Sequence, residues 1–121
     1  MIQVVALVRD LLFRAKIDAA AEKLGVAVAY ASTVEAAARQ CAKLRPTLVV
    51  ADLSDSAFPA AETVQALRTA FSPARLCGFA SHVDLKALRQ AREAGFEQTL
   101  SRSEFSARLG ELLAAAKPAG S

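Results

Sequence analysis

Five short apolar runs alternate with five longer amphipathic stretches along the chain, and this alternation restricts the fold more than any other feature of the sequence. Continuously apolar runs of about four to eight residues are typical of strands covered by helices on both faces, and the stretches between them have the helical period. Repeated strand and helix units of this kind predict an α/β fold with a parallel sheet. We expect strands at residues 2–8, 26–31, 47–53, 76–80 and, from a weaker pattern, 96–100.

Glycine and proline mark the ends of the predicted helices. Gly25 and Gly95 follow two amphipathic stretches at the position where glycine commonly ends a helix, and Pro46 and Pro73 follow two others. Each stretch has apolar residues at helical spacing, so each predicts a helix with one buried face. The five stripes are Phe13, Ile17, Ala20 and Leu24; Val34, Ala37, Ala38, Cys41 and Leu44; Val64, Leu67 and Phe71; Leu85, Leu88 and Ala91; and Phe105, Leu109, Leu112 and Ala116.

Polar residues before three of these stripes predict helix caps. Ser32 with Glu35 has the spacing of a capping box for the second helix, and Asp84 and Ser103 are placed to cap the fourth and the fifth. We therefore expect one domain over residues 1–116, followed by a disordered polar tail at 117–121.

Composition restricts the class of protein. Hydrophobic residues make up 54% of the 121 residues, but 28 of them are alanines and no apolar stretch approaches the roughly 20 residues of a membrane-spanning helix. The N-terminal residues have no signal-peptide pattern, and Cys41 and Cys77 form no disulfide framework, so we expect a cytoplasmic protein. The ten arginines and five lysines are spread along the chain, and nothing in their arrangement predicts nucleic-acid binding.

Right-handed crossovers favour the strand order 2-1-3-4-5 for a doubly wound sheet of five units. In that order the ligand crevice lies beyond the carboxyl ends of the first and third strands. The polar residues that follow the relevant strands are Arg9, Asp10, Asp52, Ser81 and His82.

At these residues the chain resembles the receiver domain of bacterial response regulators, a flavodoxin-like fold. The most specific segments are residues 45–53, RPTLVVADL, and residues 94–102, AGFEQTLSR. The resemblance implies that Asp52 is in the position of the phosphoacceptor aspartate and that Asp10 and Asp52 are in metal-binding positions. It also implies that Ser81 is the hydroxyl residue that contacts a phosphoryl group.

Three positions depart from the receiver pattern. Arg9 stands where that family has an acid, Arg102 where it has a lysine followed by proline, and Thr99 where it often has a switching aromatic. A unit positive charge about 5 Å from Mg²⁺ costs roughly 7 kcal/mol at an effective dielectric constant of 20, whereas millimolar binding is worth only about 4. Arg9 would have to swing away for Mg²⁺ to bind. The alternative is an internal network in which Arg9 and Arg102 face Asp10 and Asp52 and replace the metal.

Other chemistry has weaker support in the sequence. Cys77 with nearby His82 suggests a thiol nucleophile, but Cys77 lies inside an apolar strand pattern, where a core cysteine is expected. His82 is the single histidine, so no metal site with two histidines is available, and no phosphate-binding glycine loop follows the first strand.

We therefore predict a non-enzymatic, receiver-like signalling module that works by protein contact without phosphorylation and has no cofactor. The alternative is a phosphoaccepting receiver of a two-component system, with Asp52 as phosphoacceptor and Mg²⁺ as its metal. The resemblance makes the fourth helix, fifth strand and fifth helix the contact face; a homodimer also stays open. The basic residues expected on or beside that face are Lys86, Arg89, Arg92, Arg102 and Arg108.

Overall fold

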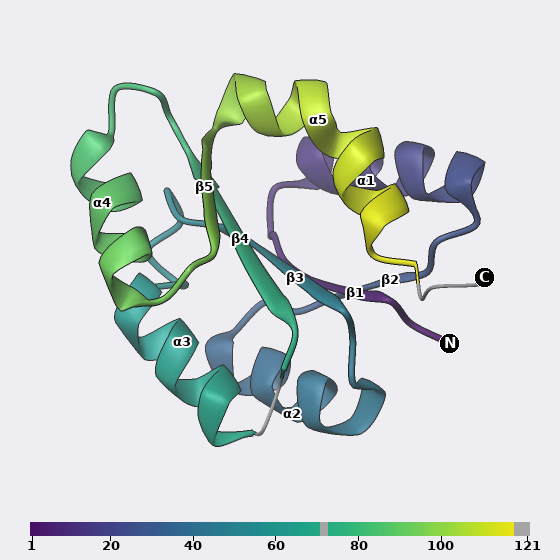
Figure 1. Cartoon of the computed structure of the whole chain (residues 1–121), viewed down its shortest axis with the longest axis horizontal. Helices are drawn as coiled ribbons and strands as arrows, with labels where there is room; N and C mark the ends of the chain where they lie inside the picture. Colours follow the sequence, from purple (N-terminus) through teal and green to yellow (C-terminus); the bar gives the residue numbers. More distant parts are fainter. Residues whose placement is uncertain (71–72, 118–121) are drawn as a thin grey trace.

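The protein forms a single parallel sheet covered by helices on both faces (Figure 1). A computed structural model describes residues 1–70 and 73–117. The strand order is β2-β1-β3-β4-β5, which confirms the predicted doubly wound topology. The strands are β1 (Val4–Leu7), β2 (Val28–Tyr30), β3 (Leu48–Asp52), β4 (Arg75–Ala80) and β5 (Gln98–Ser101).

Two helices cover one face of the sheet and three cover the other. Figure 1 shows α1 and α5 together on one side, with α2, α3 and α4 on the opposite side. The helices are α1 (Leu11–Leu24), α2 (Val34–Leu44), α3 (Ala60–Thr69), α4 (Leu85–Ala94) and α5 (Arg102–Ala115). None of the helices within the described ranges is both long and apolar enough to cross a membrane.

The central strands are buried on both faces, as their continuous apolar sequences predict. In β1, Val4 and Ala6 pack in the cluster beneath α1 and α5, whereas Val5 and Leu7 pack on the α2, α3 and α4 side. β2 is shorter than expected and only half-buried, because it is the edge strand and pairs with β1 alone.

Several predicted boundaries are confirmed. Gly25 ends α1 with φ of 68°, a left-handed conformation that favours glycine, and Asp84 caps α4 by accepting a hydrogen bond from the Ala87 amide. β5 begins two residues later than expected, at Gln98. Phe71 of the predicted third stripe and residues 118–121 of the predicted tail lie outside the described residues.

Two predicted helix caps are wrong by one or two residues. Thr33, not Ser32, caps α2, since helical geometry begins at Val34 and the Thr33 hydroxyl accepts from the Ala36 amide.

The cap of α5 is Ser101 rather than Ser103, because α5 follows β5 with no intervening loop. The Ser101 hydroxyl accepts from the Glu104 amide, and the Glu104 carboxylate accepts from the Ser101 amide. The hydrogen bonds from Ser101 lower the pKa of Glu104. This capping box fixes the start of α5, and with it the backbone of Arg102.

Candidate functional site

The carboxyl ends of four strands meet at one edge of the sheet, and most of the predicted site residues lie there. β3 ends at Asp52, Arg9 and Asp10 follow β1, Ser81 follows β4, and Arg102 follows β5. Because parallel strands all point the same way, their carboxyl ends form a single crevice. The topology therefore brings together residues that are up to 93 positions apart in the chain, from Arg9 to Arg102.

Asp52 is the buried acid at the base of this crevice, with 5% of its surface exposed. Its Oδ1 accepts hydrogen bonds from the amide and the hydroxyl of Ser54. Nη2 of Arg102 donates to Ser54 Oγ at 2.8 Å and lies 3.8 Å from Asp52 Oδ1. A guanidinium and a serine hydroxyl thus surround the carboxylate.

Arg9 makes a separate ion pair across the mouth of the crevice. Its Nε and Nη2 donate to the two carboxylate oxygens of Asp55, each at 2.6 Å. This bidentate contact lowers the pKa of Asp55 and raises the pKa of Arg9. The pair joins the loop after β1 to the loop after β3.

Asp10 takes no part in either pair and instead caps α1. Its Oδ1 accepts hydrogen bonds from the amides of Leu12 and Phe13. The predicted network of Arg9 and Arg102 with Asp10 and Asp52 is therefore wrong in its membership. Arg102 faces Asp52 as expected, but Arg9 pairs with Asp55 because Asp10 is oriented toward the helix amides.

Ser81 lies at the end of β4, where its hydroxyl accepts a weak hydrogen bond from the Val83 amide at 3.4 Å. Among the described residues, no hydrogen bond joins Ser81 to Asp52. It is half-buried and lines a hollow on the α1 and α5 side of the crevice.

The residues present do not fit the Mg²⁺ ion that a phosphoaccepting receiver would use. Within residues 1–70 and 73–117, no three Asp, Glu, His or Cys side chains come together as a metal site. Mg²⁺ requires near-octahedral oxygen coordination, whereas one of the two expected acids caps a helix and the other faces a guanidinium. The positive charge beside Asp52 belongs to Arg102.

An aromatic stack beneath the crevice supports Arg102. The ring centroids of Phe13 and Phe79 lie 5.1 Å apart, and those of Phe79 and Phe105 lie 4.2 Å apart. Cζ of Arg102 lies 5.1 Å from the centroid of Phe13. The stack joins α1, β4 and α5, so it holds the guanidinium in place by a cation–π contact.

Ser54 and Asp55 are functional candidates that the sequence analysis missed. The polar run Ser54, Asp55 and Ser56 comes directly after the apolar strand that ends at Asp52, and this run was the available signal. The acid with which each arginine pairs depends on how the loops lie relative to one another. The periodicity of the sequence does not predict the relative positions of these loops.

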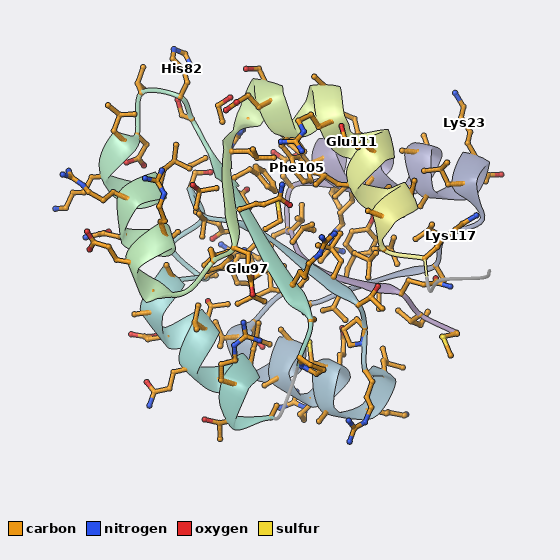
Figure 2. All side chains as sticks on the ribbon, in the orientation of Figure 1. Lys23, His82, Glu97, Phe105, Glu111 and Lys117 are labelled. Atoms are coloured by element: carbon orange, nitrogen blue, oxygen red, sulfur yellow. The ribbon has the colours of Figure 1, made fainter. Side chains whose placement is uncertain are left out.

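The thiol of Cys77 lies in the hydrophobic core. Cys77 is fully buried inside β4, and burial raises its pKa to about 11. The exposed His82 lies in the loop between β4 and α4, at the outer edge of the molecule (Figure 2). The two side chains do not form a nucleophile and base pair.

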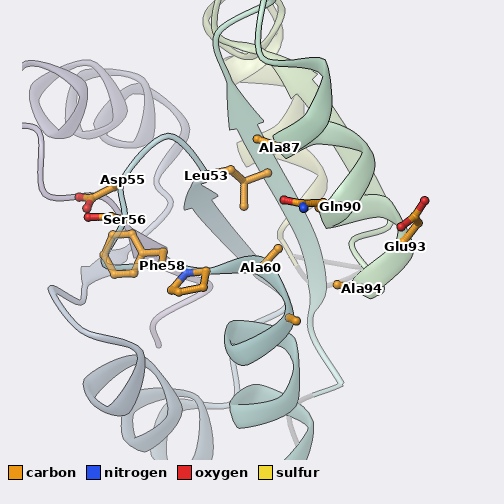
Figure 3. A pocket seen from close by; sticks show the side chains of 11 residues that line it. Leu53, Asp55, Ser56, Phe58, Ala60, Ala87, Gln90, Glu93 and Ala94 are labelled. Carbon is orange, nitrogen blue, oxygen red and sulfur yellow. The ribbon is translucent and has the colours of Figure 1, made fainter.

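A shallow hollow of about 570 Å³ lies beside the crevice, between the β3–α3 loop and α4 (Figure 3). Small side chains leave this space open, with Ala60 at the start of α3 and Ala87 and Ala94 on α4. Gln90 and Glu93 lie on its α4 wall, and Asp55 lies at its opposite end (Figure 3). Asp55, the partner of Arg9, therefore lies between the crevice and this hollow.

No protein-family model matches this sequence, and no curated protein matches it. Solved structures do match in fold. A response regulator from Hahella chejuensis superposes with a TM-score of 0.83 at 14% identity, covering 100% of this chain and 98% of that one. The chain has the receiver fold.

Two further solved structures have the same receiver fold. The chemotaxis response regulator CheY4 of Vibrio cholerae gives a TM-score of 0.77 at 16% identity, covering 97% of this chain and 99% of that one. The receiver domain of the sensor histidine kinase PA1611 from Pseudomonas aeruginosa gives a TM-score of 0.77 at 14% identity, covering 92% of this chain and 93% of that one. That receiver domain contains a magnesium ion in its active site cleft, whereas the crevice of this chain has the two arginine pairs.

Proposed function

We propose that this receiver-fold domain is a non-enzymatic signalling module that works by protein contact and does not accept a phosphoryl group on Asp52. The observation that carries the proposal is the guanidinium of Arg102, 3.8 Å from the buried Asp52 carboxylate. This contact partly neutralises the Asp52 carboxylate from within the protein.

The second arginine supports the same proposal. Arg9 lies at the mouth of the crevice and is held there by both oxygens of Asp55. Phosphoryl transfer depends on cations that neutralise the transferring group. Each arginine is already paired with an acid, so neither cation is free to neutralise an incoming phosphoryl group. This arrangement suits a module with constitutive binding.

The contact surface that we propose lies on α4 and the adjoining strand and helix. Lys86 and Arg89 are exposed on α4, and Arg92 donates to the Thr99 hydroxyl at 3.4 Å while remaining exposed. We predict an acidic protein surface as the partner.

Two of the basic residues contribute less to this surface than the sequence suggested. Arg108 is already paired with Glu111 at 3.4 Å. Arg102 is directed toward Asp52 and Ser54.

Phosphorylation is tested by incubating the protein with acetyl phosphate and Mg²⁺ and measuring its intact mass. We expect no increase by one phosphoryl group under conditions that fully modify a phosphoaccepting receiver treated in parallel. A stoichiometric adduct that disappears in Asp52→Asn would refute the proposal and establish the phosphoaccepting alternative.

Contact through α4 is tested by reversing two charges. Binding of a captured partner should be lost in the double variant Arg89→Glu/Arg92→Glu and should weaken with salt in the parent. The matched control is Arg39→Glu/Lys43→Glu, which makes the same charge change on α2, a helix separated from α4 by α3. Equal loss in both variants, or loss in neither, would exclude α4 as the contact surface.

A further inference from the structure

A larger hollow lies on the other side of Arg102, between α1, the β4–α4 loop and the start of α5. Its volume is about 890 Å³. The β4–α4 loop and the start of α5 lie close together at the edge where His82 is found (Figure 2). The lining residues are Phe13, Lys16, Ser81, His82, Arg102, Ser103, Ser106 and Ala107.

The charged side chains of this hollow are cationic. Lys16 and Arg102 carry positive charges, whereas none of the described lining residues is acidic. Nζ of Lys16 lies 5.4 Å from the Phe13 centroid, and Cζ of Arg102 lies 5.1 Å from the same point. Two like charges gathered over one ring repel, so an anion between them is favoured.

Neither cation has all its hydrogen-bonding capacity used. Lys16 makes no ion pair with any residue in the described ranges, and the Arg102 side chain is 42% exposed. An anion that enters the hollow would meet the Lys16 ammonium and the exposed part of the Arg102 side chain. Because Nη2 of Arg102 already contacts Asp52 and Ser54, the same guanidinium links this hollow to the crevice.

Three serine hydroxyls complete the donor set. The Ser81 hydroxyl accepts from the Val83 amide and keeps its own proton free to donate, Ser103 lies 3.3 Å from the Ser101 hydroxyl, and Ser106 is on the next turn of α5. Together with the cations, these groups offer more donors than the two oxygens of a carboxylate can accept. The three terminal oxygens of a phosphate monoester suit them better, and Phe13 and Ala107 give an apolar wall for the ester group.

We propose that this hollow binds a small organic phosphate monoester without covalent reaction. Lys16, Arg102 and the serine hydroxyls hold the phosphate, and the organic group lies against Phe13 and Ala107. This site goes beyond protein contact at α4, since it gives the domain a small-molecule input. Ligand contact with Arg102 competes with Asp52 and Ser54 for the guanidinium, so occupancy is communicated to the loop after β3.

Phenyl phosphate in the presence of a metal chelator is a suitable probe, because the chelator prevents Mg²⁺-dependent transfer to Asp52. Titration followed by amide chemical shifts should move resonances of α1, the β4–α4 loop and the start of α5, with a Kd of about 1 mM or lower. Unchanged intact mass afterwards shows that binding is not phosphorylation. The result is therefore independent of the acetyl phosphate test.

Lys16→Gln and Ser106→Ala should each raise the Kd for phenyl phosphate, the lysine change by about tenfold. Lys23→Gln is the matched control, since it removes the same charge from the same helix outside the hollow, and its Kd should equal that of the parent. Benzoate, which has the same ring with a carboxylate, should bind about tenfold more weakly. The proposal is overturned by absence of shifts, by shifts centred elsewhere, by equal affinity in Lys16→Gln, or by benzoate binding as tightly as phenyl phosphate.

Discussion

The contact between Arg102 and Asp52 predicts a measurable coupling free energy. At 3.8 Å the Coulomb attraction is about 4 kcal/mol for an effective dielectric constant of 20 and about 1 kcal/mol in water. Asp52 is nearly buried, whereas the Arg102 side chain is 42% exposed, so the pair lies between these limits and solvent screening weakens it. We expect a coupling of about 1–2 kcal/mol from a double-mutant cycle.

The cycle uses Arg102→Gln, Asp52→Asn and the double variant, each unfolded in urea. Urea is preferable to guanidinium chloride because it does not screen charges. Arg102→Gln should destabilise more than Asp52→Asn, since it leaves a buried carboxylate without its cation, while the reverse change leaves a half-exposed guanidinium. Adding 1 M salt should reduce the coupling only in part.

A matched control is the exposed pair of Arg108 with Glu111, whose atoms are 3.4 Å apart. The double-mutant cycle for this pair should give a coupling free energy of less than about 0.5 kcal/mol, because both side chains are exposed to water. If the Arg102 cycle gives no more than this control, or if millimolar Mg²⁺ stabilises the parent protein, the guanidinium is not the cation that neutralises Asp52.

Three further predictions follow from single contacts. Gly78→Ala should lower the free energy of unfolding in urea by about 1–3 kcal/mol, because an added Cβ would lie 2.5 Å from Leu53 Cδ1 and 2.9 Å from its Cγ; unchanged stability would contradict this packing. The buried thiol of Cys77, with its pKa near 11, should react with iodoacetamide slowly in the native state and fast in denaturant, and equal rates would disprove its burial. The Asp55 pKa is held below 3.8 by Arg9, so this pair stabilises the native state above that pH and the contribution disappears as the pH falls through the native pKa. The stability difference between the parent and Asp55→Asn should therefore narrow on acidification below pH 3.8, and a difference that widens would refute the pairing.

The secondary structure and the strand order could be predicted because both depend on patterns that the sequence carries locally. Apolar runs and helical stripes follow from which faces must be buried, and the crossover rule then restricts the order of strands. The caps at Thr33 and Ser101 differed from prediction because neighbouring serines and threonines are chemically equivalent. The point where the preceding strand ends decides which of them precedes the first helical residue.

The sequence predicted part of the candidate site, including the contact of Arg102 with Asp52, but not the pair of Arg9 with Asp55. The sequence placed Asp52, Arg9 and Arg102 at one edge, since each follows a parallel strand. It also contained a local signal for Asp10 as a helix cap, because an aspartate directly before an apolar helical stripe is a typical N-cap. The choice of Asp55 by Arg9 had no such signal.

A long arginine side chain can reach any of several acidic residues. The distance between the loops determines which of these acids it pairs with. The hollow beside Arg102 has the same origin, since its walls come from α1, from the β4–α4 loop and from α5. Periodicity is a property of one segment and determines what that segment becomes. The arginine pairs and the cationic hollow are properties of segments brought together, so only the tertiary structure decided them.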